Sequence, residues 1–100
     1  MSVEQLRNAL FYSSNDVVRD DAAQQLAERH CQEDEAQTAL FEGSLSAVLD
    51  DSLKRTCAES LAEIWIRRNQ INDDLYERLT VNKFREVIDA FLHAPKPSGW

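Results

Sequence analysis

The stretch "DVVRDDAAQQLAE" at residues 16–28 is nearly repeated as "DSLKRTCAESLAE" at residues 51–63. A shift of 35 residues aligns five identical pairs: Asp16 with Asp51, Ala23 with Ala58, Leu26 with Leu61, Ala27 with Ala62, and Glu28 with Glu63. The apolar positions of each copy recur about every three or four residues, which places them on one face of an α-helix. A repeated amphipathic helix predicts similar helical units that stack to bury their apolar faces.

Few helix breakers interrupt this pattern. Only two glycines and two prolines occur among 100 residues, and three of these four lie beyond residue 93. Ser2 and Gln5 have the spacing of a capping box, in which each side chain bonds a backbone N–H at the helix start. Gly43 is expected to kink or split the third helix. Periodicity and capping residues together predict helices over residues 3–12, 16–30, from 34 onward, 51–68, 75–79 and 84–92.

The predicted fold class is all-α, with about six helices in antiparallel pairs. The helix over residues 51–68 has the widest apolar stripe, which includes Cys57 and Trp65, so we expect it to be central. Cys57 is predicted to be a small buried thiol and Trp65 a core residue. Residues 1–93 form one predicted domain, and residues 94–100 form a tail because Pro95 and Pro97 exclude helix there.

The repeated segment resembles the first helix of a HEAT-type repeat, the two-helix unit of α-solenoids. The resemblance covers about residues 14–80, and the second copy departs from it at Lys54 and Cys57. It implies a short HEAT-like α-solenoid of two units, each a longer helix followed by a second one. The helices over 3–12 and 84–92 would then act as caps that close a compact bundle. The resemblance also implies that Val18 points inward, that Ala22 and Ala23 permit close packing, and that Asp16 and Arg19 help hold successive repeats together.

The charge of the chain restricts its partners. Eighteen acidic residues against eleven basic ones give a net charge of −7. Such a surface repels nucleic acid and anionic membranes and suits a basic protein, although solubility alone is an alternative explanation. The first residues lack a basic segment followed by a long apolar run, and no stretch has about 20 apolar residues, so we expect a cytoplasmic protein.

No catalytic or metal-binding pattern emerges from the sequence. His30, Cys31, Cys57 and His93 lack the spacing of metal ligands. "EGSLS" at residues 42–46 lacks the second glycine of a nucleophile elbow, and two glycines cannot build a phosphate loop. Adjacent carboxylates at predicted helix starts, such as those of Asp50 and Asp51, are better suited to capping helices. We therefore predict no enzymatic activity, no cofactor and no metal.

Acidic residues near two predicted turns are candidates for binding a partner. The turns that follow the second and fourth helices should lie on the same edge of the molecule, and the second helix of each unit should line a concave face. Trp100, on the tail, either folds back onto the helices or reaches a partner. The candidate partner-binding residues at that edge and face are Glu33, Asp34, Glu35, Glu42, Asp73, Asp74 and Glu77.

Small size, acidic charge and the lack of a catalytic set favour a protein inhibitor. The chain is similar to small acidic bacterial immunity proteins, which implies that it neutralises a basic nuclease-type toxin exchanged between cells by binding it directly. Nucleases must contact phosphates and therefore have basic clefts. We expect a monomer. The alternatives are a HEAT-like scaffold or adaptor that binds a peptide or helix of another protein and, less favoured, a lyase-like enzyme.

Overall fold

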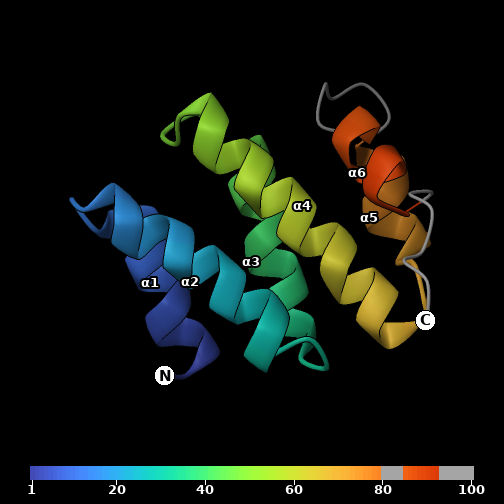
Figure 1. Ribbon diagram of the computed structural model, residues 1–100, viewed down its shortest axis with the longest axis horizontal. Coiled ribbons are helices and arrows are strands. Elements are labelled where there is room, and N and C mark those ends of the chain that lie inside the picture. The colour runs from blue at the N-terminus through green and yellow to red at the C-terminus, as the bar shows by residue number, and fades with distance from the viewer. Residues whose placement is uncertain (80–84, 93–100) are drawn as a thin grey trace, which may run out of the picture.

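The computed structural model describes residues 1–79 and 85–92, and this part of the chain is all-α (Figure 1). The number of helices matches the prediction, and the described ranges contain no β-strand. The predicted tail, Phe84, His93 and Trp100 lie outside the described residues. The helices are α1 (Val3–Tyr12), α2 (Asp16–Arg29), α3 (Asp34–Leu45), α4 (Asp51–Arg68), α5 (Asp73–Arg78) and α6 (Arg85–Leu92).

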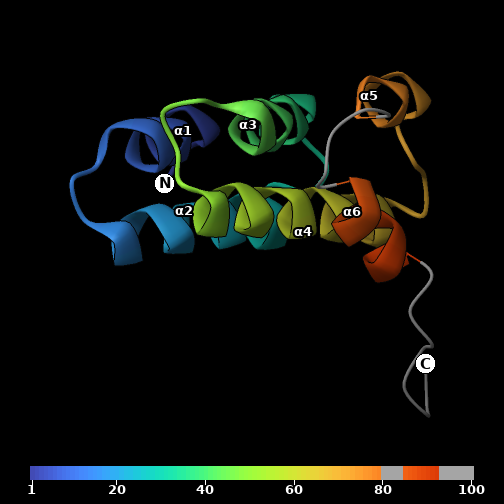
Figure 2. The same cartoon turned by 90° about the horizontal axis from the view of Figure 1, so that it is seen from above.

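The helices form two layers. Figure 2 shows α1, α3 and α5 in one layer and α2, α4 and α6 in the other. Helix α4 contacts α2, α3 and α6, so it is central, as its wide apolar stripe predicts. Figure 1 shows α2 and α4 side by side and running in the same direction. Their buried faces carry the small residues Ala22, Ala23, Ala27, Ala58 and Ala62.

Local capping explains where the helices begin and end. The Ser2 hydroxyl accepts from the Gln5 backbone N–H at 3.2 Å, and the Gln5 side chain accepts from the Ser2 N–H at 2.8 Å, which confirms the predicted capping box. The Asp50 carboxylate accepts from the Leu53 N–H at 2.8 Å and starts α4. Asn69 ends α4 in the left-handed conformation, with φ of 53°. The bounds predicted for the helices over 3–12 and 51–68 are therefore confirmed.

The pairing of helices differs from the predicted units. The most extensive packing joins α1 to α2 and α3 to α4, whereas α2 and α3 make a smaller contact. The repeated segments therefore form the second helix of each antiparallel pair rather than the first, and α1 is a full partner of α2 rather than a cap. The sequence could not show this, because a repeat has the same period wherever its unit is taken to begin.

Two residues of the repeated motif behave differently from what the resemblance implied. Val18 is 43% exposed rather than inward-pointing, because no described element covers that side of the first turn of α2. Its counterpart Leu53 is buried. Arg19 donates from Nη2 to the Phe11 carbonyl oxygen at 2.9 Å and so caps the last turn of α1. This hydrogen bond joins the two helices of one pair rather than successive repeats.

A kink or a split was expected at Gly43, and the structure shows that α3 is not split there. The helix continues through it to Leu45. A Cβ atom at position 43 would lie 2.6 Å from the Cys57 Sγ and 3.3 Å from the Cys57 Cβ. Gly43 is therefore needed because α3 and α4 approach closely at this position. It acts as a packing residue and not as a helix breaker.

Replacing Gly43 by alanine should destabilise the protein, although alanine favours helix over glycine. Overpacking against Cys57 is expected to lower the free energy of unfolding by about 1–3 kcal/mol. Adding Cys57→Ala should recover part of that loss, because it removes the nearest atom. Urea denaturation of the single and double variants measures both effects, with Thr38→Ala, at an exposed position of α3, as the control for helix propensity. A more stable Gly43→Ala protein would contradict the packing role.

The Cys57 thiol is fully buried, as predicted, and burial raises its pKa from 9.0 to about 12, with a smaller contribution from the Asp20 charge. Between these two values the unfolded thiol releases its proton while the folded thiol keeps it. The unfolded state then binds fewer protons, so stability should fall as pH rises from 9.0 toward 12. Denaturation across this range should show a steeper loss for the wild type than for Cys57→Ala. Equal slopes would mean that the thiol titrates normally.

Candidate functional site

The edge predicted to gather acidic residues exists in the structure. The turns after α2 and α4 border a hollow of about 340 Å³, to which both Asp34 and Asp73 contribute. Asp34 is not free there, because its Oδ1 accepts from Arg68 Nη2 at 2.8 Å. The hollow is polar and of mixed charge. Its lining residues are Asp34, Gln37, Arg68, Gln70, Ile71, Asn72 and Asp73.

Several of the predicted binding acids already contact polar side chains within the chain. Glu33 contacts the Nδ1 of His30, which ends α2 and whose Nε2 lies 2.9 Å from the Met1 carbonyl oxygen. Glu42 bonds Arg7 at 2.9 Å, and Asp74 lies 3.3 Å from Arg78. The two arginine ion pairs lower the negative potential that Glu42 and Asp74 can offer a partner.

The other predicted residues lie in the layer of α1, α3 and α5. Glu35 and Asp73 form no ion pair with a described residue, and Glu77 is exposed on α5. Glu35 borders a groove of about 500 Å³ between α1 and α3. Val3 and Ala39 contribute apolar surface to the groove, while Arg7 adds positive charge to its wall. Of the predicted residues, Asp34 and Asp73 therefore border the polar edge, and Asp34 and Glu35 border the apolar groove.

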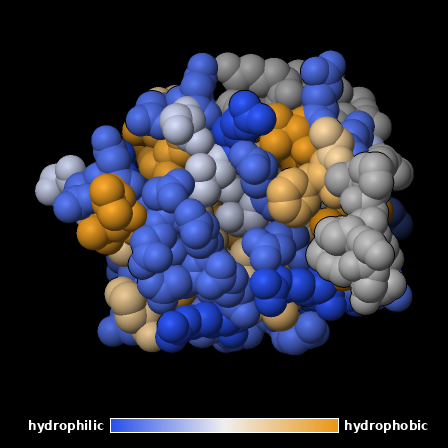
Figure 3. Space-filling view, viewed as in Figure 1, coloured by the Kyte–Doolittle hydropathy of each residue, from blue (hydrophilic) through white to orange (hydrophobic). Residues whose placement is uncertain are grey.

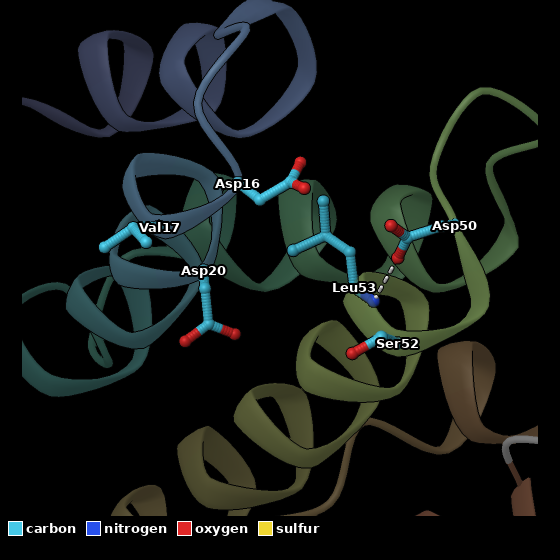
Figure 4. Close-up of a pocket in the computed structure, with 6 residues that line it drawn as sticks. All are labelled: Asp16, Val17, Asp20, Asp50, Ser52 and Leu53. Atoms are coloured by element: carbon cyan, nitrogen blue, oxygen red, sulfur yellow. Dashed lines mark hydrogen bonds between the residues drawn. The ribbon is translucent and has the colours of Figure 1, made fainter.

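A second acidic surface, which was not predicted from the sequence, covers the outer side of α2 and α4. Two hollows of about 320 and 340 Å³ lie along it, and Asp20 borders both, so they adjoin. Figure 4 shows the first, between the start of α2 and the start of α4. We call this surface the α2/α4 face and define it by its carboxylates: Asp16, Asp20, Glu28, Asp50, Glu59 and Glu63.

The charge of the α2/α4 face is only partly balanced. Glu59 lies 3.3 Å from Arg55, and Glu63 accepts from Arg67 at 2.8 Å. The carboxylates of Asp16, Asp20 and Glu28 form no ion pair with any residue in the described ranges. Asp20 only accepts from the Gln24 amide at 2.7 Å. Arg67 also attracts Glu28 electrostatically, so the negative charge of this face is reduced near the end of α2 and is least balanced at Asp16 and Asp20.

The repeat itself contained the signal for this face. Because α2 and α4 lie side by side and parallel, residues at equivalent repeat positions become neighbours across the two helices. Glu28 and Glu63 are such a pair, and both border the second hollow. They are the only two of the six carboxylates that occupy equivalent repeat positions, so the repeat indicated this face only in part.

The described residues offer no group of three His, Cys, Asp or Glu side chains placed to hold a metal ion. Of the two cysteines, Cys57 is buried and Cys31 is partly exposed. No helix in the ranges 1–79 and 85–92 has both the length and the hydropathy needed to cross a bilayer.

No protein-family model, curated protein or solved structure matches this chain. The likeness to HEAT-type repeats and to immunity proteins therefore rests on the sequence pattern alone.

Proposed function

We propose that this chain is a non-catalytic inhibitor, an immunity protein that binds a basic nuclease-type toxin in the cytoplasm. The observation that carries the proposal is the α2/α4 face, where Asp16, Asp20 and Glu28 lack an ion pair with the described residues. A nuclease cleft must be basic to grip phosphates, so it is complementary to such a face. Long-range attraction would speed the encounter, and burial of the cleft would block nucleic acid.

The arrangement of helices suits this role. The carboxylates lie on two parallel helices that pack against each other and carry buried alanines, so their spacing is set by the fold before binding. A preorganised surface loses less conformational entropy on association than a flexible one. Direct occlusion by a rigid acidic face requires no catalytic residue, and one copy of the chain is sufficient.

A scaffold or adaptor function is the second candidate. The observation in its favour is the α1/α3 groove of about 500 Å³, whose apolar surface includes Val3 and Ala39. An amphipathic helix or an extended peptide of another protein could lie in such a groove. Peptide binding in this groove would have modest affinity, and that affinity would depend less on salt concentration than docking on the α2/α4 face.

Affinity capture of the tagged protein from its native cell would test the proposal. The bound fraction is washed at low and then high salt, identified by mass spectrometry, and assayed for nuclease activity before and after denaturing release and refolding. One basic partner that is silent while bound and cuts nucleic acid after release is the expected result. Several weak partners, or a single partner without that activity, would move the assignment to the adaptor function.

A further inference from the structure

One end of the molecule exposes several apolar side chains. Tyr12, Val17 and Val48 are 76%, 77% and 73% exposed, far more than is usual for side chains of this kind. They lie at the α1–α2 and α3–α4 turns, and Figure 3 shows hydrophobic surface where α2 begins, bordered by hydrophilic side chains. Exposed apolar surface with a polar rim is typical of a protein-binding site. We call this surface the apolar end and define it by Tyr12, Val17, Val18, Leu45 and Val48.

The first hollow of the α2/α4 face opens at this apolar end. Val17 and Leu53 are the apolar residues among those that line it, together with Asp16, Asp20, Asp50 and Ser52. Figure 4 shows Asp16 and Leu53 between the starts of the two helices, with Asp50 at the start of α4 and Asp20 further along α2. Asp50 accepts from the Leu53 N–H at 2.8 Å, and none of the three forms an ion pair with a described cation. The hollow therefore combines unbalanced negative charge with an apolar wall in a volume of about 320 Å³.

An arginine side chain has the chemistry that complements this hollow. Its guanidinium carries a permanent positive charge and can donate to two carboxylates at once, while its aliphatic stem packs on apolar side chains. Residues flanking such an arginine could contact the apolar end if they were themselves apolar. Arginine is also enriched among the residues that dominate binding energy at protein interfaces.

We infer that the hollow between the starts of α2 and α4 is the socket for an arginine of the partner protein, and that apolar residues beside that arginine cover the apolar end. This inference rests on the proposed function, because it takes the partner to be a basic protein. Beyond that function, it specifies where the partner's arginine binds and that the residues beside this arginine are apolar.

The test is a titration of the ¹⁵N-labelled protein with acetyl-Leu-Arg-Leu-amide, followed by NMR. The control peptide replaces arginine by citrulline, which keeps the shape and removes the charge. The arginine peptide should shift the backbone amides of Val17, Asp20, Ser52 and Leu53 in a saturable manner. Because hydrogen bonds to charged groups are markedly stronger than those between neutral groups, the citrulline peptide should bind at least about tenfold more weakly.

Protein variants make the assignment specific to the socket. Asp16→Asn with Asp20→Asn should weaken binding of the arginine peptide about tenfold or more, and Val17→Ser should also weaken it. The matched control is Asp21→Asn, also exposed on α2, whose carboxylate bonds the Gln25 side chain and does not line the hollow. Circular dichroism verifies that each variant is folded.

Equal binding of the two peptides, or shifts that lie away from the hollow, would overturn the inference. So would an Asp16→Asn/Asp20→Asn variant that binds as tightly as the Asp21→Asn control. If the peptide titration fails while affinity capture yields a basic, salt-sensitive partner, the socket is wrong and the proposed function stands. If capture yields no basic partner, the proposed function fails independently of the titration.

Discussion

Replacing Trp65 by alanine is expected to lower the free energy of unfolding by about 3–5 kcal/mol. The side chain is fully buried in α4, and its Nε1 donates to the Oε1 of the buried Gln37 on α3. Its ring meets Tyr76 of α5 edge-on at a centroid distance of 6.3 Å, and the Tyr76 hydroxyl donates to Asp89 of α6. The substitution therefore removes a large core side chain where four helices are linked. A domain of this size has a total stability of about 5–15 kcal/mol, so the loss would be severe.

Urea denaturation followed by circular dichroism measures this effect without depending on tryptophan emission. Trp65→Phe separates volume from hydrogen bonding, because it keeps an aromatic ring but leaves the Gln37 carbonyl unpaired, at a cost of about 1–3 kcal/mol. Ile66→Ala is the matched control, since the neighbouring Ile66 is 37% exposed. A Trp65→Ala protein no less stable than this control would show that the tryptophan is not a core anchor.

Reversing charge on the α2/α4 face should slow association with the captured partner by about 10- to 1000-fold at low salt. The variant is Asp20→Lys with Glu28→Lys, which inverts two carboxylates that form no ion pair with a described residue. Both side chains border the second hollow, outside the core, so folding should be retained. Stopped-flow mixing at several salt concentrations measures the association rate, and the difference from the wild type should shrink as salt rises.

The control for this experiment is Asp73→Lys with Asp74→Lys, which changes the net charge equally at the edge predicted from the sequence. If docking uses the α2/α4 face, this control should slow association much less. If only the control variant slows association, the partner binds at the turns after α2 and α4. If both variants associate as fast as the wild type, docking is not electrostatic and the inhibitor proposal is wrong.

Local signals made most of the fold predictable. The bounds of α1 and α4 follow from side chains that cap their first turns, and such bonds depend on residues only three positions apart. The burial of Cys57 and Trp65 follows from the apolar stripe of α4. These features are local in sequence, so the chain reveals them without any knowledge of which helices pack together.

The features that could not be predicted depend on contacts between helices. Val18 shares a helical face with buried residues, but it lies in a first turn that no described element covers. Gly43 resembles a breaker until its distance to Cys57 is known. The α2/α4 face likewise requires the parallel placement of the two repeated helices, so the sequence led first to the turns that carry Asp34 and Asp73.

The alanines buried on α2 and α4 have a consequence for how recognition could diverge between related chains. Ala23, Ala27, Ala58 and Ala62 have essentially no exposed surface, and their small size determines how closely α2 and α4 pack against the helices around them. A single interior change to valine would push the two rows of carboxylates apart without altering any residue that a partner touches. Selectivity for a partner could therefore shift through mutations in the interior, and comparing only the surfaces of two such chains would miss the cause.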